Sequence, residues 1–331
     1  MTPPVESILR GKRVLVTGSA GFIGSHLCEA LVDLGCDVVG LDDLSAGRRR
    51  NLVPFATSPN FRLVEADICD VQSVRRAFER GLDIIFHNAA SKKTVCLRDP
   101  PRDLAVNAGG TLRLLQLASE LGVGKFVHAS TGSVYGEPRV FPTDEQHPLD
   151  PVSCYGVSKL AAERYVQVFH QLYGLNTTIL RYFHVYGPRQ ESNEFGGVVS
   201  IFLRNIVTGT NLKIFGDGSQ VRSFTWVKDI VRANLLAAVC PRSNGEAYNC
   251  ASGIQVTIRE LAEGLVSLAG PEKSVSVDYE PWVPGDIKRF IVSNRKIREH
   301  FGIEFEQDFW GMLKKSWDEF LKYIPRDPQT I

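Results

Sequence analysis

Tyr155 and Lys159, which lie four residues apart in a segment of helical character, have the side chains of a proton-transfer pair. Residues at this spacing share one face of a helix, so the ammonium group would lie near the phenol. A free tyrosine titrates near pH ~10, and a base for neutral pH needs a pKa about three units lower, or about 4 kcal/mol of electrostatic stabilisation. The charge of Lys159 and a positively charged cofactor ring would together supply it. Many proteins contain such a pair by chance, so the pair alone identifies no reaction.

Hydroxyl groups lie shortly before this helix in the chain. Thr131 follows a predicted strand at residues 125–129 and would share a substrate oxygen with Tyr155. Gly132 and Ser133 come next and are candidate substrate contacts. The predicted catalytic residues are Thr131, Tyr155 and Lys159.

A glycine-rich turn joins the first predicted strand, residues 13–17, to the first predicted helix, residues 23–34. Glycines there allow a tight turn and let backbone N–H groups approach a pyrophosphate at the start of the helix. The spacing is G-x-x-G-x-x-G rather than the common G-x-G-x-x-G, and a glycine-rich turn in an ordinary α/β protein is the alternative. The candidate dinucleotide contacts in this turn are Gly18, Gly21, Phe22, Ile23 and Gly24.

An aspartate at the end of the second predicted strand supports a dinucleotide site. Asp42 lies where a carboxylate accepts hydrogen bonds from the hydroxyls of the adenosine ribose. It would repel a 2′-phosphate, so NAD is favoured over NADP, although the arginines at 48–50 leave NADP as an alternative. Asp67 and Ile68 would bracket the adenine ring, unless Asp67 is instead the N-cap of the next helix.

The elements that must position these residues alternate between short β-rich runs and amphipathic helical runs. The predicted strands cover residues 13–17, 37–41, 61–65, 84–86, 125–129 and 177–181, and the predicted helices cover residues 23–34, 71–79, 104–121 and 155–173. This alternation indicates an α/β fold with a Rossmann-type, doubly wound parallel sheet covered on both faces. We expect an NAD-binding domain at residues 1–187. Residues 188–331 would form mainly a smaller mixed α/β substrate domain at the C-terminal end, with some segments returning to the sheet.

Composition excludes several classes of partner. The 331 residues include 38 Lys and Arg against 37 Asp and Glu, so no long-range field attracts nucleic acid or an acidic membrane. Seven scattered cysteines without Cys-x-x-Cys spacing are typical of reduced thiols in the cytoplasm. No run of 18 apolar residues predicts a membrane span, and no histidine spacing predicts a metal site. We therefore expect a cytoplasmic protein with no nucleic acid, membrane or metal partner.

As an ordered set, the motifs of this chain resemble the extended short-chain dehydrogenase/reductase family, in particular its nucleotide-sugar epimerases and dehydratases. The resemblance covers nearly the whole chain. The motifs that carry it are Gly18/Gly21/Gly24, His87-Asn88-Ala89-Ala90, Asn107 with Gly110-Thr111, Thr131 before Val134-Tyr135-Gly136, Tyr155/Lys159, Arg181-Tyr182-Phe183, Val185-Tyr186-Gly187-Pro188-Arg189, Gly216-Asp217-Gly218 with Arg222, and Gly285-Asp286.

The resemblance implies a nucleoside diphosphate sugar whose C4 hydroxyl lies at Tyr155. Tyr155 would take the hydroxyl proton while hydride passes from C4 to NAD, which gives the 4-keto sugar shared by the family. Related dehydratases carry Asp-Glu directly after the catalytic threonine, and related decarboxylases usually keep the glutamate, whereas this chain has Gly132-Ser133. The remaining chemistry is 4-epimerisation of a UDP-sugar, with NAD retained because no net redox change occurs. A dehydratase, a decarboxylase, an NAD(P)H-dependent reductase and a non-catalytic NAD-binding regulator are the alternatives.

The resemblance implies further site residues, several of which have a purely structural alternative. The additional cofactor contacts would be Ser45, Ala89, Ala90, Lys92 and Asn107, and the additional substrate contacts would be His184, Arg189, Val198, Arg222, Asp286 and Phe290. In the structural alternative, Lys92 and Arg222 are surface charges, and His184 and Phe290 are core residues. Relatives often carry Arg where this chain has Val283, so anchoring of the diphosphate would shift to Arg222, with Lys213 or Arg289 as further candidates.

Three residues bear on the choice of sugar, and the resemblance bears on assembly. Arg189 would pair with a C6 carboxylate and Ser133 would donate a further hydrogen bond to it, which slightly favours UDP-glucuronate and UDP-galacturonate over UDP-glucose and UDP-galactose. The Gly-Pro-Arg-Gln stretch that contains Arg189 also occurs in epimerases of neutral sugars. Phe290 would limit the space for an N-acetyl group. A homodimer paired through the helices at 104–121 and 155–173 is expected from the resemblance.

Overall fold

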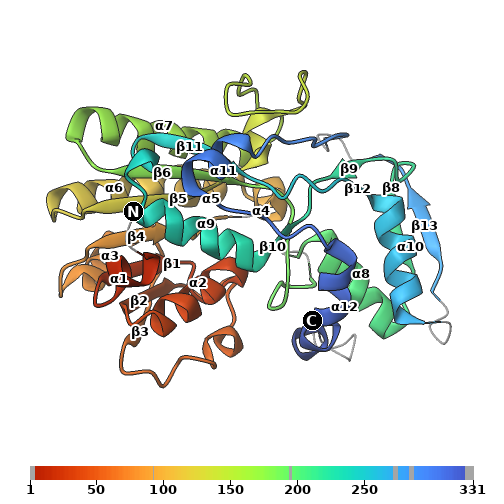
Figure 1. The fold of residues 1–331 in the computed structure, drawn as a ribbon, viewed down its shortest axis with the longest axis horizontal. Coiled ribbons are helices and arrows are strands. Elements are labelled where there is room, and N and C mark those ends of the chain that lie inside the picture. The colour runs from red at the N-terminus through yellow and green to blue at the C-terminus, as the bar shows by residue number, and fades with distance from the viewer. Residues whose placement is uncertain (1–3, 92, 194–195, 271–274, 283–286, 325–331) are drawn as a thin grey trace.

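Seven parallel strands form the central sheet of the protein (Figure 1), whose computed structural model describes residues 4–91, 93–193, 196–270, 275–282 and 287–324. Across the sheet the order is β11-β6-β5-β4-β1-β2-β3. The strands are β1 (Arg13–Thr17), β2 (Asp37–Asp42), β3 (Phe61–Glu65), β4 (Ile84–His87), β5 (Lys125–Thr131), β6 (Thr177–Tyr182) and β11 (Glu246–Cys250). The central strands are buried along almost their whole length, because helices cover both faces of the sheet.

The order of the strands reverses between β1 and β4. Val14 of β1 pairs with Val38 of β2 on one side and with Ile84 of β4 on the other. At such a point the connections leave the sheet in opposite directions, and a crevice opens at the carboxyl ends of the strands. The predicted Rossmann-type, doubly wound parallel sheet is confirmed.

Two layers of helices enclose the sheet (Figure 1). One face carries α1 (Val5–Leu9), α2 (Phe22–Asp33), α9 (Val227–Val239) and α11 (Arg295–Phe301), and the other carries α3 (Val71–Arg75), α6 (Thr111–Glu120) and α7 (Cys154–Tyr173). Neighbouring residues of a strand point to opposite faces of the sheet. Val14 and Val16 belong to the apolar core under α2 and α9, and Leu15 belongs to the core under α6 and α7.

The helix that carries Tyr155 and Lys159 has a clear start and a clear end. At its N-terminus, the Ser153 hydroxyl accepts a hydrogen bond from the Gly156 N–H at 3.1 Å. At its C-terminus, Gly174 adopts a left-handed conformation with φ of +68°. The helix predicted at 155–173 is therefore confirmed, with α7 one residue longer at the start.

The predicted start of the helix at 104–121 is wrong. The helical segment begins earlier, as α5 (Pro100–Leu104), and passes through a π-helical turn at Ala105–Gly110 before α6. The Asp99 side chain caps α5 by accepting from the Arg102 N–H at 3.0 Å. Prolines in the first turn have no N–H to lose there, so they favour a helix start that periodicity alone did not indicate.

Segments after residue 187 contribute to the large sheet and to a smaller unit. β11 pairs with β6 and α9 packs against α2, so both lie within the layers of the sheet. The smaller unit, at the right-hand end in Figure 1, contains α8 (Val198–Thr208), β8 (Leu212–Phe215), β9 (Val221–Arg222), β12 (Val256–Thr257), α10 (Ile258–Ala269), β13 (Val277–Glu280) and α12 (Phe309–Tyr323). It has its own apolar core, which includes Phe202, Leu261 and Phe309. The division of the chain at residue 187 stays a prediction.

Shorter elements complete the described chain. They are α4 (Lys93–Arg98), the pair of strands β7 (Val185–Tyr186) and β10 (Thr225–Trp226), and single turns at Arg49–Leu52, Arg76–Phe78, Gly132–Tyr135 and Pro241–Ser243. Within the described ranges, no helix combines the length and apolar character needed to cross a membrane. The same residues contain no group of three or more His, Cys, Asp and Glu side chains arranged to hold a metal ion.

A buried ion pair connects β6 to α7 behind the carboxyl end of the sheet. Arg181 donates to the Glu163 carboxylate from Nε at 3.0 Å and from Nη2 at 2.7 Å, and the two side chains are only 3% and 1% exposed. The Ser130 hydroxyl donates to the same carboxylate, and Arg181 Nη1 donates to the Tyr135 hydroxyl at 2.7 Å. Such pairs are tolerated in a core because hydrogen bonds satisfy both charges.

We predict that Glu163→Ala lowers the free energy of unfolding by about 3–5 kcal/mol, because it leaves the buried Arg181 guanidinium without its counter-charge. Urea denaturation followed by circular dichroism measures this. The matched control is Glu120→Ala, which removes an exposed carboxylate paired with Arg75 at 3.2 Å and is expected to change stability little. Equal losses in the two variants would contradict the role of burial.

Candidate cofactor cleft and active site

A cleft of about 380 Å³ opens where β1, β2, β4 and β5 end, and it collects most of the residues predicted to bind a cofactor. Those that line it are Gly18, Gly21, Phe22, Ile23, Gly24, Asp42, Ser45, Asp67, Ile68, Ala89, Ala90, Tyr155 and Lys159. The volume falls within the range of ~300–1,000 Å³ that is usual for ligand sites. The fold therefore brings the glycine-rich turn and the Tyr–Lys pair into one cleft.

The glycine-rich turn packs too closely for side chains at two of its positions. A Cβ at Gly24 would lie 2.0 Å from the carbonyl oxygen of Gly18, so α2 begins in direct backbone contact with the turn. Gly18 has a φ of +69°, and a Cβ there would lie 2.8 Å from the Ala89 nitrogen. This packing leaves the N-terminus of α2 at the cleft, with N–H groups free to bind a pyrophosphate.

Asp42 is held in a fixed orientation in the wall of the cleft. Its carboxylate accepts hydrogen bonds from the Ala20 N–H at 2.8 Å and the Leu44 N–H at 2.9 Å. Burial raises the pKa of Asp42, while these two hydrogen bonds act in the opposite direction. A Cβ at Gly47 would lie 2.6 Å from Asp42 Oδ1, so the next loop closes tightly over it. A buried, oriented carboxylate in this place fits the ribose hydroxyls of an adenosine.

Asp67 and Ile68 lie in the cleft wall as predicted for an adenine site. The alternative for Asp67 was a helix N-cap, and the structure gives that role to Asp70, whose side chain accepts from the Gln72 N–H at 3.1 Å and the Ser73 N–H at 3.4 Å. Burial acts to raise the pKa of Asp67, but hydrogen bonds from Cys69 and Arg102 outweigh it and hold this pKa below its usual value.

The three predicted catalytic residues lie together. Tyr155 and Lys159 come from the first turns of α7, and Thr131 ends β5 beside them. The Thr131 hydroxyl accepts from the Ser133 N–H at 3.2 Å and donates to the Ser133 hydroxyl at 3.3 Å, and it lies near enough to the Tyr155 phenol to lower the pKa of that group. Lys159 Nζ donates to the Ala129 carbonyl at 2.6 Å, which fixes the ammonium group against the end of β5.

Burial determines the proton affinities of this group. It raises the pKa of Tyr155 to about 12, while the Thr131 hydroxyl lowers it and the Asp103 carboxylate raises it. Burial lowers the pKa of Lys159 to about 8, although the nearby carboxylates of Glu163 and Asp103 act to raise this pKa. At neutral pH Tyr155 therefore keeps its proton and Lys159 carries its charge. The protein's own groups do not provide the expected lowering of the Tyr155 pKa.

Asn107, predicted to touch the cofactor, instead supports the walls of the cleft. Its Oδ1 accepts from the Ser91 N–H at 2.9 Å, and its Nδ2 donates to the Ser158 hydroxyl at 2.9 Å and to the Asp103 carboxylate at 3.0 Å. Because Asn107 is fully buried behind Ser91, which itself lines the cleft, it orients the segment after β4 relative to α7.

The predicted substrate residues of the turn after β5 contact a cluster of aromatic rings. Phe290 packs against the rings of Phe183 and His184, with centroids 5.5 and 5.3 Å apart. A Cβ at Gly132 would lie 2.3 Å from the Phe183 ring, so Gly132 is tightly covered. Phe290 is buried in this cluster, as in the core alternative.

Arg222 and Val198 come from the smaller unit. Arg222 is buried on β9 and donates to the carbonyls of Val221 at 3.1 Å and Lys288 at 3.4 Å, so the alternative of a surface charge is wrong. Val198 is the first residue of α8. The structure does not place either residue in the wall of the cleft. Lys92, Val283 and Asp286 lie outside the described residues.

The placement of Arg189 corrects the expectation that it pairs with a sugar carboxylate. Its guanidinium is buried and forms an ion pair with Glu29 of α2 at 2.8 Å, away from the lining of the cleft. The left-handed backbone at Arg189, with φ of +66°, turns the side chain to this position. Sequence reasoning missed this because Glu29 and Arg189 are joined only by the tertiary fold.

Several cleft residues were not singled out from the sequence. They include Asp43, Gly47, Asn51, Asn88, Arg102, Tyr182 and Glu191. Asn88 and Tyr182 belong to motifs quoted above, and they contact each other, since the Tyr182 hydroxyl donates to Asn88 Oδ1 at 3.4 Å. Arg102 and Glu191 reach the cleft from α5 and from the loop after β7, and no spacing in the sequence signals either.

Comparison with known proteins agrees with this geometry. The model of the NAD dependent epimerase/dehydratase family matches residues 14–251. A UDP-glucose 4-epimerase of Mycolicibacterium smegmatis is 41% identical over 295 residues, covering 88% of this chain and 92% of that protein.

Two solved structures have the same fold. A UDP-glucose 4-epimerase of Thermotoga maritima with UDP-glucose has a TM-score of 0.87 and 38% identity, and the match covers 94% of this chain and 99% of that one. A UDP-glucuronic acid 4-epimerase of Bacillus cereus, in complex with UDP-glucuronic acid and NAD, has a TM-score of 0.85 and 30% identity over the same shares of the two chains. The chain therefore belongs to the NAD dependent epimerase/dehydratase family, and NAD is its cofactor.

Proposed function

We propose that this protein is a UDP-sugar 4-epimerase that interconverts UDP-glucose and UDP-galactose. The observation that carries the proposal is that Tyr155 and Lys159 line the cofactor cleft, with Thr131 beside them at the end of β5. Thr131 is directly followed by Gly132, which has no room for a side chain. The 41% identity to a UDP-glucose 4-epimerase over most of both chains supports the same reaction.

The chain's own residues would hold and move one proton in this reaction. When bound, NAD supplies the group that accepts a hydride from C4 of the sugar and returns it. Tyr155 would take the proton of the C4 hydroxyl and give it back, with the Thr131 hydroxyl near the phenol. Lys159, fixed by the Ala129 carbonyl, lines the same cleft one helical turn from Tyr155. The lowering of the phenol's pKa that a base needs would come with the positive charge of the bound cofactor ring.

The packing at Gly132 argues against dehydration. In related dehydratases an Asp-Glu pair follows the catalytic threonine. Here the ring of Phe183 lies 2.3 Å from the site of a Cβ at position 132, so an acidic side chain would require Phe183 and the aromatic cluster around it to move. Elimination needs an acid and a base that this turn does not supply. Epimerisation needs, besides the proton exchange at Tyr155, only that the hydride returns to the opposite face of the 4-keto sugar.

The environment of Arg189 favours a neutral sugar over a uronate. A carboxylate at C6 would need a cation in reach, and the buried guanidinium of Arg189, whose Nη2 pairs with Glu29, does not line the cleft. UDP-glucuronate, slightly favoured from the sequence, becomes the second candidate. The 30% identity to a UDP-glucuronic acid 4-epimerase and the hydroxyl of Ser133 keep it as the alternative for the test.

The test is a proton NMR time course of the purified protein with UDP-glucose, without added NAD. We expect the anomeric signal of UDP-galactose to appear and to reach equilibrium. Parallel samples contain UDP-glucuronate and dTDP-glucose. Conversion of UDP-glucuronate alone would overturn the choice of sugar, and a 4-keto-6-deoxy product from dTDP-glucose would overturn epimerisation.

Substitution of the base gives the second prediction. Tyr155→Phe keeps the ring but has no proton to exchange, so we expect turnover to fall at least about 100-fold while NAD stays bound. The NMR assay and the absorbance of bound cofactor measure the two effects. Tyr173→Phe changes an exposed tyrosine at the far end of the same helix and serves as the control. A Tyr155→Phe variant that keeps normal turnover would exclude Tyr155 as the base.

Cofactor choice is tested at the end of β2. Asp42→Ala removes the carboxylate that the Ala20 and Leu44 N–H groups orient, so we expect it to weaken NAD binding more than NADP binding. Calorimetric titration of the cofactor-free variants with both dinucleotides measures this difference. Asp37→Ala, at the opposite end of the same strand, is the control. Equal losses of affinity for NAD and NADP would contradict the proposal that Asp42 binds the ribose hydroxyls.

We also propose that the protein forms a homodimer through α7. Four exposed apolar side chains lie along this helix at spacings that put them on one face: Val157, Tyr165, Val168 and Leu172. Leu104 of α5 is exposed as well, and α5 packs against α7. An exposed apolar stripe of this length is typical of a protein–protein interface.

Light scattering after size exclusion tests the dimer. Val168→Glu places a charge in the middle of the stripe, so we expect a shift from dimer to monomer at micromolar concentration. Val53→Glu changes a valine that is 69% exposed, against 38% for Val168, directly after the Arg49–Leu52 turn, and it should leave the mass unchanged. A wild-type protein that is monomeric, or a Val168→Glu variant that remains dimeric, would contradict this interface.

A further inference from the structure

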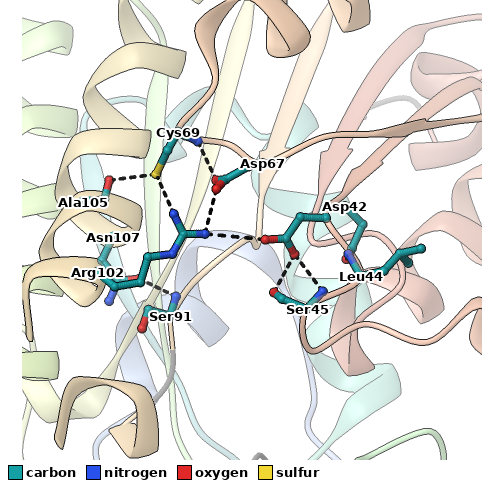
Figure 2. A network of polar contacts seen from close by, with 10 residues as sticks. Asp42, Leu44, Ser45, Asp67, Cys69, Ser91, Arg102, Ala105 and Asn107 are labelled. Atoms are coloured by element: carbon teal, nitrogen blue, oxygen red, sulfur yellow. Dashed lines mark hydrogen bonds and ion pairs between the residues drawn. The ribbon is translucent and has the colours of Figure 1, made fainter. Parts of the chain in front are cut away.

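Arg102 bridges two loops at the adenosine end of the cofactor cleft. It extends from α5, and its Nη2 lies 2.9 Å from Asp67 Oδ2 (Figure 2). The same Nη2 lies 3.6 Å from Asp43 Oδ2. Asp43 follows β2 and Asp67 follows β3, so one guanidinium connects α5 to the ends of two strands. Arg102, Asp43 and Asp67 all line the cleft.

A second ionic bridge holds the same region from the other side. The Glu191 carboxylate, from the loop after β7, lies 3.4 Å from Arg48 Nε and 3.4 Å from Arg50 Nη2. Glu191 lines the cleft, and its side chain is only 10% exposed. The two arginines belong to the same β2–β3 connection as Asp43, so this connection is joined to α5 by one bridge and to the loop after β7 by the other.

The segment between the two bridges is part of the cleft wall. Ser45, Ala46, Gly47 and Asn51 line the cleft, and they lie between or beside the bridged residues in the chain. The Ala20 carbonyl accepts from the Arg48 N–H and from Asn51 Nδ2, each at 2.9 Å, so the segment is also attached to the glycine-rich turn. We call residues 43–51 the clasp.

We propose that the ion pairs formed by Arg102 and Glu191 hold the clasp closed over NAD. In this role the two residues slow the release of the cofactor. This inference rests on NAD binding and not on the identity of the sugar. The bridges join walls of the cleft that lie far apart in the sequence, so a dinucleotide enclosed between these walls leaves only after the bridges open. Because an epimerase uses the same NAD in every turnover, a closed clasp does not slow its reaction.

The charges of the bridges decide how the clasp responds to salt. Their side chains are partly exposed, from 10% for Glu191 to 44% for Arg50, so each bridge adds little to the stability of the fold. Mobile ions screen such pairs, since the Debye length falls from about 10 Å at 0.1 M salt to about 3 Å at 1 M. The release rate of NAD is therefore expected to rise with ionic strength.

The experiment measures release of NAD from the holoprotein. Protein loaded with adenine-labelled NAD is mixed with excess unlabelled NAD at 0.05 M and 1 M NaCl, and the loss of label is followed by rapid filtration. The variants are Arg102→Gln, Glu191→Gln and the double variant. Arg75→Gln, which breaks an exposed ion pair with Glu120 outside the cleft, is the control. Circular dichroism checks that every variant is folded.

We expect about tenfold faster release from each single variant at low salt, which corresponds to about 1.4 kcal/mol, and faster release still from the double variant. We also expect salt to accelerate release from the wild type but hardly from the double variant. The control should release NAD at the wild-type rate. Release rates that are equal in all variants, or equally salt-dependent in the wild type and the double variant, would overturn the clasp.

Two further outcomes would also overturn it. If Arg102→Gln left NAD release unchanged and instead weakened binding of NADP, Arg102 would be a ligand of the 2′-phosphate and not part of a clasp. If the variants lost UDP-sugar turnover in the presence of saturating NAD but retained the label normally, the two residues would serve the reaction rather than retention. A failure of the proposed sugar specificity changes none of these readouts.

Discussion

The backbone contact between Gly18 and Gly24 is the constraint on which the site depends. Because no side chain fits between them, α2 begins directly at the end of β1, and its N-terminus faces the edge where β2 and β4 also end. Ala20, in the middle of this turn, then orders its neighbours. Its N–H holds Asp42, and its carbonyl holds Arg48 and Asn51. One turn thus fixes the helix N-terminus predicted to bind the pyrophosphate, the carboxylate predicted to bind the ribose and the loop that lies beside them.

The proton chemistry depends on a second constraint, the burial of charged groups near β5. Burying an ionised side chain is costly, so each such group here has an oriented partner: Lys159 has the Ala129 carbonyl, and Glu163 has Arg181 and Ser130. The same burial makes the Tyr155 phenol a weak acid and Lys159 a weaker base than usual. The phenol is thereby prepared to hold a proton, and a further positive charge in the cleft would be needed to release it.

The sequence predicted those parts of the structure that local patterns determine. Strand and helix bounds along the sheet agree with the structure to within one or two residues for most elements, because the apolar runs and glycine stops are local signals. The glycine turn, Asp42 and the Tyr155–Lys159 pair could be found for the same reason. The π-helical turn that aims Asn107 at Ser91 and Ser158 has no such signal, and periodicity alone merged it into one long helix.

What the sequence could not predict are pairings between distant charges. The sequence predicts that Arg189 pairs with a substrate carboxylate, but in the fold Arg189 forms its ion pair with Glu29. The same reasoning applies to cofactor choice. The arginines at 48–50 left NADP as an alternative, and in the fold Arg48 and Arg50 pair with Glu191 while Arg49 pairs with Glu65.

Arg102 is committed in the same way, to Asp67 and Asp43, so every one of these four guanidinium groups already has a carboxylate partner. A 2′-phosphate would have to break one of these pairs and would then lie beside the buried carboxylate of Asp42. Under the proposal, the ion pairs that would keep NAD in the cleft would also disfavour NADP, and retention and selectivity would share one physical origin.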